Sequence, residues 1–164
     1  MKVDGPGMPT SEDPQPVTLA QVRTEADLMQ ALAIREVVFI EEQHVPEVIE
    51  RDAEDARAYH VLAFQGRDAI GTGRLVMLPE PPRGEKGQWA QIGRMAVLQS
   101  HRKAQVGSLM LANVEEEAKR RGVSGIMLHA QLYAMEFYEK HGYVPVGTAF
   151  QEAGIEHQEM HKRF

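Results

Sequence analysis

The sequence predicts a mixed α/β domain. Segments rich in β-branched and aromatic residues, which are typical of strands, lie on both sides of segments whose apolar residues have helical spacing. The chain has 164 residues, of which 43% are hydrophobic, enough for one domain with a sizeable core. We expect residues 17–164 to form this domain. Residues 1–16 contain four prolines and few large apolar side chains, which indicates a flexible tail.

The first half of the domain is predicted to contain strands, one helix and an acidic connection. Residues 17–22 favour a strand. Thr24 is a residue type that favours helix N-termini, and apolar residues at helical spacing extend that helix to about residue 39. An acidic connection over 41–57 follows. The next predicted strands cover 59–64, 69–78 and 89–98.

The second half is predicted to begin with the strongest helix. Apolar residues repeat at three and four positions over 106–118, basic residues fill the last turn, and Gly122 follows as a cap. A short buried strand over 125–130 leads to a short helix that ends at Gly142. The last two predicted strands cover 143–147 and 157–163.

Composition argues against several classes of protein. The formal net charge is −6, whereas general nucleic-acid binders are basic, so we expect no nucleic-acid partner. The absence of cysteine excludes disulfides, thiol nucleophiles and cysteine metal sites. The histidines form no H-E-x-x-H or helical H-x-x-x-H pattern, so no metal is expected. Without a long apolar run or a signal-peptide pattern, we expect a cytoplasmic protein with no membrane partner.

The turn before the helix at residue 106 has features of a phosphate-binding loop. A helix N-terminus presents free N–H groups and partial positive charge, which attract phosphate. Arg102 and Lys103 add charge, Gly107 permits close backbone approach, and Ser108 supplies a hydroxyl. Taken alone, these residues equally describe an ordinary connection with solvated basic side chains.

The motifs around this turn resemble the GNAT family of acetyl-CoA-dependent N-acetyltransferases. They read IGRMAVLQSHRKAQVGSLMLANVEEEAKRRG from Ile92 and IMLHAQLYAMEFYEKHGYVPVG from Ile126. Residues 38–63 and the ending FQEAGIEHQEM are similar to the ElaA- and YjcF-like bacterial branch. The resemblance covers about 17–164. It implies the GNAT fold, a central mixed, mostly antiparallel twisted sheet with splayed parallel strands 4 and 5, flanked by helices.

The resemblance implies acetyl-CoA as the cosubstrate. Gln105 stands where the family usually has glycine, and we expect right-handed helical backbone there and weakened rather than abolished binding. Ala96 or Val97 is expected to offer an N–H to the developing oxyanion. The implied cofactor contacts are Met95, Ala96, Val97, Arg102, Lys103, Ala104, Gln105, Val106, Gly107, Ser108, Gln131 and Tyr138.

Transfer of an acyl group from a thioester to an amine uses a general acid and a general base. Tyr138 in FYEKHG matches the family's acid, since a phenol with a pKa of about 10 is protonated at neutral pH. The alternative is a core tyrosine. We expect Phe137 to face the core and Tyr138 to lie on another face. Glu42 and His129 are the candidate bases, and an imidazole titrates near neutrality.

The acceptor site is less well defined by the sequence. Residues 41–55 hold seven carboxylates, most of which we expect to be solvated. Arg94 is expected either to hold a carboxylate or phosphate of the acceptor or to pair with this acidic segment. For any single residue, a structural hydrogen bond is the alternative role. The candidate substrate contacts are Glu50, Asp52, Arg94 and His157.

The leading hypothesis is an N-acetyltransferase that moves an acetyl group from acetyl-CoA to a primary amine of a small molecule, by direct attack in a ternary complex. The alternatives are a peptide or protein N-acetyltransferase, a non-catalytic acyl-CoA-binding sensor, and transfer of a different acyl group. The resemblance also implies a homodimer formed through the terminal strands.

Overall fold

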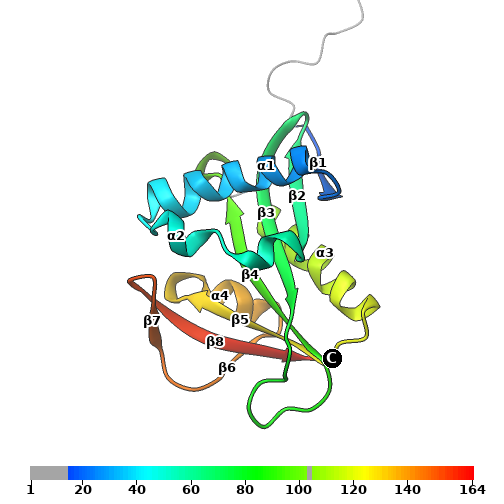
Figure 1. Cartoon of the computed structure of the whole chain (residues 1–164), viewed down its shortest axis with the longest axis vertical. Coiled ribbons are helices and arrows are strands. Elements are labelled where there is room, and N and C mark those ends of the chain that lie inside the picture. Colours follow the sequence, from blue (N-terminus) through cyan, green and yellow to red (C-terminus); the bar gives the residue numbers. More distant parts are fainter. Residues whose placement is uncertain (1–14, 103–104) are drawn as a thin grey trace, which may run out of the picture.

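A computed structural model describes residues 15–102 and 105–164, so residues 1–14 of the predicted tail lie outside it. Its centre is an eight-stranded sheet in the order β1-β2-β3-β4-β5-β8-β6, with β7 paired to β8 (Figure 1). The β4–β5 pair is parallel and the other pairs are antiparallel, which confirms the predicted mixed sheet. The strands are β1 (Val17–Gln21), β2 (Tyr59–Gln65), β3 (Asp68–Met77), β4 (Trp89–Val97), β5 (Gly125–Gln131), β6 (Val144–Pro145), β7 (Phe150–Glu152) and β8 (Ile155–Arg163).

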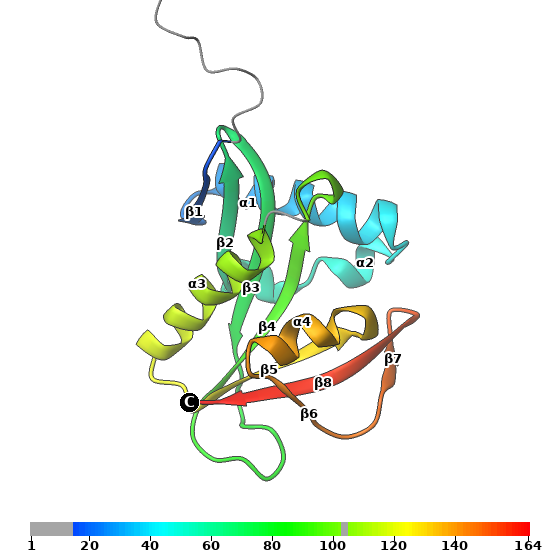
Figure 2. The same cartoon turned by 180° about the vertical axis from the view of Figure 1, so that it is seen from behind.

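Helices cover both faces of the sheet. α1 (Glu25–Arg35) lies on one face, and α3 (Val106–Arg120) and α4 (Met135–Lys140) lie on the other (Figure 2). The shorter helical segments are α2 (Glu47–Glu50), η2 (Ala53–Ala56), η3 (Gln99–His101) and η4 (Leu132–Ala134). No helix in the described residues is long and apolar enough to cross a membrane.

Each face of the sheet has its own apolar core. The smaller core lies under α1 and includes Ile34, Val38 and Leu62. The larger core lies under α3 and α4, where buried apolar side chains of β2, β3, β4, β5 and β8 meet both helices. Its largest fully buried members include Leu75, Ile92, Met110, Leu111, Ile126, Leu128, Tyr143 and Met160.

The predicted start of α1 at Thr24 is confirmed, but its end differs. Thr24 Oγ1 accepts a hydrogen bond from the Asp27 N–H at 3.1 Å, and the Asp27 carboxylate accepts one from the Thr24 N–H at 3.2 Å. After Arg35 the chain continues as a π-helix, η1 (Glu36–Glu42). This wider helix has no simple periodic signature in sequence, and such segments are frequent at functional sites.

The C-terminal strands differ from the predicted ones. The strand expected over 143–147 shortens to β6, β8 begins two residues before the predicted start at 157, and β7 was not predicted. Ala153 (φ 51°) and Gly154 (φ 76°) form the turn between β7 and β8. Two consecutive positive φ angles fit a tight hairpin turn. Alanine is not typical of such turns, so the sequence did not predict this one.

The prediction for the α4 aromatic pair was wrong. Tyr138 is the buried member, with 8% of its surface exposed, while Phe137 is half-buried against the same core. The two rings meet edge to face at 5.0 Å, and Tyr143 packs against the other side of Tyr138 at 5.8 Å. The helix is too short for its periodicity to separate two adjacent aromatic residues.

Candidate active site

A wedge-shaped gap opens between the two parallel strands. β4 and β5 pair only from Trp89 with Gly125 to Ile92 with Leu128, and the strands diverge beyond that point. The divergence follows a β-bulge, where the register between β3 and β4 shifts and Arg94 has a φ of 54°. The predicted splaying of strands 4 and 5 is therefore confirmed.

Past the bulge, β4 presents free backbone groups to the gap. The Leu98 N–H donates to the Ile70 carbonyl on β3 at 2.9 Å. Because successive residues of a strand alternate direction, the Val97 N–H points away from β3, and the Ala96 N–H points towards it. The Val97 carbonyl accepts a hydrogen bond from Arg102 Nε at 2.9 Å, which agrees with this direction. Of the two expected oxyanion donors, Val97 is the one directed to the gap.

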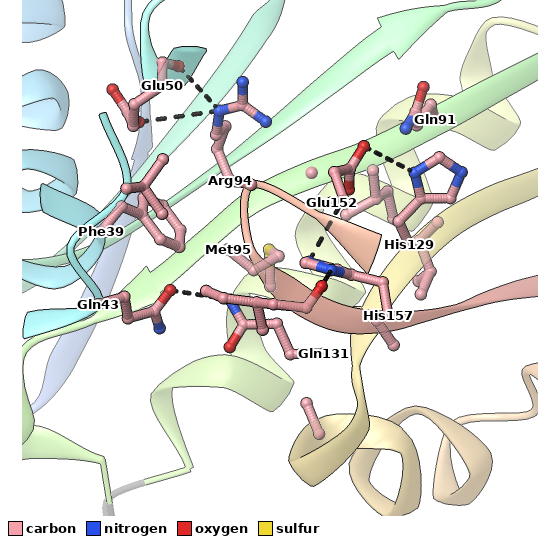
Figure 3. A pocket seen from close by; sticks show the side chains of 18 of the residues that line it. Phe39, Gln43, Glu50, Gln91, Arg94, Met95, His129, Gln131, Glu152 and His157 are labelled. Carbon is pink, nitrogen blue, oxygen red and sulfur yellow. Dashed lines mark hydrogen bonds and ion pairs between the residues drawn. The ribbon is translucent and has the colours of Figure 1, made fainter. Parts of the chain in front are cut away.

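A cavity of about 190 Å³ occupies the gap (Figure 3). Its walls come from both faces of the sheet, because Tyr138 and Met95 belong to the larger core and Phe39 to the smaller one. The remaining walls are the end of β5, the loop from η1 to α2, and the β7–β8 turn. The lining residues used below are Phe39, Gln43, Val45, Ile49, Arg94, His129, Gln131, Tyr138, Glu152 and His157.

His129 lies in the cavity wall between two carboxylates. Its Nδ1 is 3.3 Å from Glu152 Oε1, and its Nε2 is 3.5 Å from Glu159 Oε1. The hydrogen bond to Glu152 and the charges of both carboxylates outweigh burial and raise the pKa of His129. The same contact lowers the pKa of Glu152. The pKa of the imidazole therefore lies above its ordinary value.

His157 is held differently from His129. Its Nδ1 lies 2.7 Å from the Ile155 carbonyl, so Nδ1 donates and carries the proton in the neutral ring. Its Nε2 lies 3.8 Å from Glu152 Oε2. Phe150 stacks on His157 and meets His129 edge-on, so the two imidazoles share one aromatic neighbour.

Tyr138 reaches the cavity from the other face of the sheet. Burial raises the pKa of its phenol well above the ordinary value, so the group is protonated across the physiological range. His129 and Tyr138 thus approach the gap from opposite faces, one able to accept a proton and the other able to donate one.

The loop after η1 closes one side of the cavity through Gln43. The Gln131 side-chain amide donates to Gln43 Oε1 at 2.8 Å, which joins the end of β5 to the loop between η1 and α2. Gln131 was expected to contact the cofactor, and it lines the cavity.

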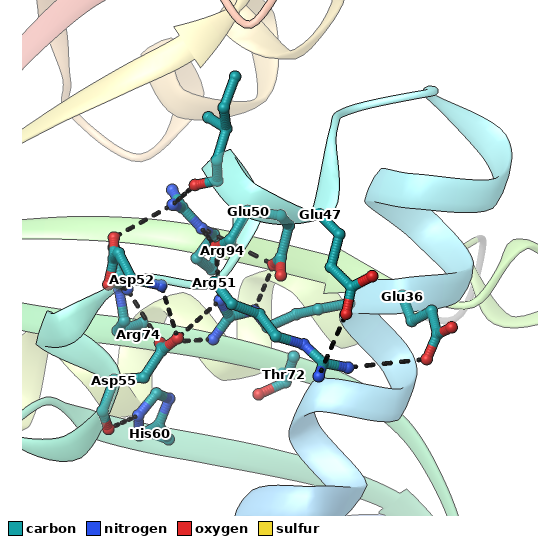
Figure 4. A network of polar contacts seen from close by, with 12 residues as sticks. Glu36, Glu47, Glu50, Arg51, Asp52, Asp55, His60, Thr72, Arg74 and Arg94 are labelled. Atoms are coloured by element: carbon teal, nitrogen blue, oxygen red, sulfur yellow. Dashed lines mark hydrogen bonds and ion pairs between the residues drawn. The ribbon is translucent and has the colours of Figure 1, made fainter.

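The acidic segment is bound to arginines rather than solvated at its centre (Figure 4). Arg35 is fully buried and contacts Glu50 at 2.5 Å and Asp55 at 2.7 Å. Arg74 contacts Asp52 at 2.7 Å and Asp55 at 2.9 Å. Glu50, expected as a substrate contact, lines the cavity, but it is 2% exposed and paired with Arg35. Asp52 is an ion-pair partner of Arg74. This network fixes the segment 50–55 against α1 and β3.

Arg94 joins the edge of this network and lines the cavity. Its Nε donates to the Glu50 carbonyl at 3.0 Å, and its Nη2 lies 3.4 Å from the Ile49 carbonyl and 3.3 Å from Asp52 Oδ2. The expected pairing with the acidic segment is therefore present. Arg94 nevertheless keeps 27% of its side chain exposed, three times the fraction of Arg74.

The turn before α3 differs from the expected conformation at one residue. Gln105 caps α3 in left-handed backbone, with φ 58° and ψ 23°, rather than in the right-handed conformation predicted. Left-handed backbone favours glycine, which is the residue that the GNAT family usually has at this position. Lys103 and Ala104 lie outside the described residues.

Several side chains of this turn already have protein partners. Arg102 holds both carboxylate oxygens of Glu42, at 3.0 and 2.8 Å. Glu42, expected as a possible base, is thus paired at the turn and is not among the described residues that line the cavity. Ser108 Oγ lies 3.1 Å from His141 Nε2. A Cβ on Gly107 would lie 3.4 Å from the Phe137 ring, which is ordinary van der Waals contact between α3 and α4.

Sequence reasoning missed several polar residues of the cavity, among them Gln43, Gln91 and Glu152. Gln43 follows a π-helix that the sequence did not predict, and Glu152 lies on the unpredicted strand β7. The only sequence signal for Glu152 was its place in FQEAGIEHQEM, five residues before His157. No group of three or more His, Asp or Glu side chains within 15–102 and 105–164 has the arrangement of a metal site.

Comparison with known proteins agrees with this geometry. Residues 20–164 match the family model described as an acetyltransferase (GNAT) domain. The chain is 37% identical over 141 residues to the uncharacterized N-acetyltransferase YjcF of Bacillus subtilis, covering 85% of this chain and 95% of that protein. The crystal structure of a putative N-acetyltransferase from Lactobacillus plantarum superposes with a TM-score of 0.76 at 28% identity, covering 90% and 97% of the two chains. Escherichia coli ElaA has the same fold, with a TM-score of 0.75 at 22% identity over 90% and 100%.

The family match covers the sheet, the gap and both helices of the larger core. The expected likeness to the ElaA- and YjcF-like branch is confirmed by these relatives. The chain belongs to the GNAT acetyltransferase family, and its reaction class is the transfer of an acyl group from CoA to an amine nitrogen.

Proposed function

We propose that the protein transfers an acetyl group from acetyl-CoA to the primary amine of a small molecule, by direct attack within a ternary complex. The observation that carries this proposal is the cavity between β4 and β5. An imidazole faces it from one face of the sheet and a protonated phenol from the other. In this proposal, the proton acceptor and the proton donor lie on opposite sides of the point where an amine and a thioester would meet.

The residues fit an extended cofactor that carries phosphates. The backbone of Met95 and Val97 has no strand partner on the gap side, so an extended amide chain there gains strand-like hydrogen bonds. The N-terminus of α3 follows after η3, and its free N–H groups favour phosphate. When bound, acetyl-CoA supplies an activated thioester carbonyl. Val97 would donate its N–H to the carbonyl oxygen as negative charge develops there.

Proton transfer by the protein side chains completes the proposed chemistry. In its neutral form, His129 accepts a proton as the amine nitrogen bonds to the carbonyl carbon. As the carbon–sulfur bond breaks, Tyr138 donates its phenolic proton to the sulfur. One proton is taken from the amine and one is given to the thiol, so exchange with water returns both residues to their starting states. Glu152 holds the imidazole and favours its charged form, which is a positioning role.

The size of the cavity supports a small acceptor over a peptide. Phe39, Val45 and Ile49 close one side, the β7–β8 turn closes the other, and the Gln131–Gln43 hydrogen bond joins two of the walls. A peptide would need an open groove across these contacts. The presence of both proton-transfer groups likewise supports an enzyme over a non-catalytic sensor.

The test is a binding measurement followed by a turnover assay. Calorimetry with acetyl-CoA, with adenosine as the control ligand, should show micromolar binding that adenosine does not reproduce. A panel of small amines and short peptides is then assayed for thiol release and for the acetylated product by mass. Tight binding without turnover of any amine would support the sensor, and turnover of peptides alone would support the peptide enzyme.

A further inference from the structure

Two side chains of opposite charge line the cavity from different strands. Arg94 extends from the bulge of β4, and Glu152 extends from β7 beside His129 (Figure 3). The positive charge of Arg94 is among the influences that lower the pKa of Glu152, so the two groups act on each other across the site. A ligand with one positive and one negative end would meet a complementary partner at each end.

The position of Arg94 depends on strained backbone. A residue with a side chain is disfavoured at φ 54° relative to right-handed backbone. Such strain persists where the surrounding structure enforces it, and a bulge redirects a side chain that a regular strand would aim elsewhere. Here the bulge and the contacts to the Glu50 and Ile49 carbonyls hold the guanidinium at the cavity wall.

Arg94 is less completely bound than the other two arginines of the network. Arg35 and Arg74 each have two carboxylate partners at 2.9 Å or less. Two of the hydrogen bonds of Arg94 go to main-chain carbonyls, and its nearest carboxylate oxygens are 3.3 and 3.7 Å away. Its Nη1 makes no hydrogen bond or ion pair with any described residue. One side of the guanidinium therefore remains able to bind an anion.

The surroundings of Arg94 also favour an added negative charge. Burial, followed by the positive charges of Arg74 and Arg35, lowers the pKa of Arg94 in spite of the nearby carboxylates. An anionic ligand would offset that repulsion. A guanidinium binds a carboxylate through two parallel hydrogen bonds, which a main-chain carbonyl does not offer.

Resting on the proposed function, we propose that the acceptor is an amino acid with an apolar side chain. Arg94 binds its carboxylate, and its amine lies towards Glu152 and His129. The apolar side chain then faces Phe39, Val45 and Ile49. A cavity of about 190 Å³ suits a ligand of this size. Glu152 attracts the ammonium form. The ammonium releases one proton to solvent, and neutral His129 accepts the second proton as the amine nitrogen bonds to the carbonyl carbon.

The test compares acceptors that differ only in the carboxylate. The pairs are leucine with 3-methylbutylamine and phenylalanine with 2-phenylethylamine, assayed for kcat/KM at saturating acetyl-CoA. The parent should prefer each amino acid by roughly 10- to 100-fold, the size of a charged hydrogen bond. Arg94→Gln should remove most of this preference while it retains turnover of the plain amines. Because a carboxylate also changes the pKa of the amine, the decisive quantity is the fall in preference from parent to variant.

Two further variants separate recognition from folding. Arg94→Lys keeps the charge without the paired hydrogen bonds, so part of the preference should remain. Arg51→Gln is the matched control, because Arg51 is a neighbouring arginine that pairs with Glu36 and Glu47 and is not among the described lining residues. The preference of Arg51→Gln for the amino acid over the matched plain amine should equal that of the parent. If Arg94→Gln does not fold, the comparison rests on Arg94→Lys and the parent.

A binding measurement separates failure of this inference from failure of the proposed function. In the presence of CoA, calorimetry compares N-acetylleucine with N-(3-methylbutyl)acetamide, a pair that contains no titrating amine. Tighter binding of N-acetylleucine that depends on Arg94 supports the inference, even if turnover is absent and the catalytic proposal fails. Equal binding, with equal turnover of the paired acceptors, overturns the inference and leaves the catalytic proposal standing. Absence of both binding and turnover overturns both.

Discussion

Gln105 shows how the backbone conformation of a single residue affects the stability of the turn before α3. Left-handed backbone costs a glutamine roughly 1–2 kcal/mol, a cost that glycine avoids. About half of this gain is offset because glycine makes the unfolded state more flexible. Gln105→Gly should therefore stabilise the protein by about 0.5–1 kcal/mol. It should also tighten acetyl-CoA binding, because a side chain is removed where backbone is expected to face phosphate.

Thermal unfolding and calorimetry measure the two effects of Gln105→Gly. His44 has a similar φ of 60° but is not among the described residues that line the cavity, so His44→Gly is the matched control. It should raise stability without changing acetyl-CoA affinity. Equal affinity in the parent and Gln105→Gly would contradict the proposed role of the side chain.

Tyr138 and Tyr143 are adjacent buried tyrosines with different expected roles. Tyr138→Phe should lower kcat by about 10²-fold, the usual contribution of a general acid, with little change in acetyl-CoA affinity. Tyr143→Phe removes the hydroxyl of a buried residue that is not among the described residues lining the cavity, and it should leave kcat nearly unchanged. Stopped assays of thiol release with both variants measure the difference. Unchanged turnover in Tyr138→Phe would exclude the acid role.

The pH dependence of the reaction should report the environment of His129. The base works when neutral, so kcat/KM should rise with pH through a pKa above the ordinary value of about 6.5. Glu152→Gln removes the contact that most raises this pKa, and the inflection should move to lower pH. Ionisation of the acceptor amine is common to both enzymes and cancels in the comparison. Glu156→Gln, an exposed neighbour, is the control, and identical pH profiles for parent and Glu152→Gln would argue against His129 as the base.

Among the elements, the segment 50–55 depends on charge pairing for its position. Burial opposes ionisation of Asp55, but Arg35 and Arg74 outweigh it and lower the pKa of Asp55 to about 2. A carboxylate whose folded pKa is depressed stabilises the fold above its unfolded pKa of about 3.9 and loses that contribution as the pH falls. The loss should therefore occur between about pH 4 and pH 2.

Urea unfolding of Asp55→Asn should show this dependence directly. At pH 5 the variant should be less stable than the parent by about 3 kcal/mol, because two buried arginines lose a partner. The difference should shrink below about pH 4, where the parent carboxylate also becomes neutral. Glu54→Gln, which affects only an exposed pair with Arg57, is the control. A difference that stays constant from pH 5 to pH 2.5 would contradict the assignment.

Elements with strong local patterns were predictable from sequence, and those set by tertiary contacts were not. The cap at Thr24, the helix α3 and the strands β2 to β5 follow from residue type and spacing. The π-helix, β7 and the left-handed Gln105 do not, because nothing in their own residues favours them over common alternatives. The ion pairs of Glu50 and Asp52 were likewise not predictable, because their arginine partners lie on α1 and β3, far away in sequence.

At the scale of the whole molecule, the gap between β4 and β5 divides the sheet into two halves joined by four paired positions. A ligand that bridges the gap adds contacts to both halves. Acetyl-CoA at 100 times its Kd should raise the free energy of unfolding by about 2.7 kcal/mol. Hydrogen exchange should slow most at 95–97 and 129–131, the strand ends that face the gap.

Hydrogen exchange with and without acetyl-CoA tests this expectation, with adenosine as the control ligand. Protection confined to the α3 N-terminus would mean that the phosphates bind while the gap remains open. Such a result would contradict insertion of the cofactor between the strands.

The two faces of the sheet are also assembled from different stretches of chain. Under the proposed function, the N-terminus of α3 and the residues of α4 form the donor side. The loop after η1 and the β7–β8 turn supply much of the acceptor side, and these are short exposed connections between fixed elements. Substitutions or insertions in those connections alter the acceptor wall without disturbing the donor side. The architecture is therefore evolvable, since a change of acceptor requires new loops rather than a new scaffold.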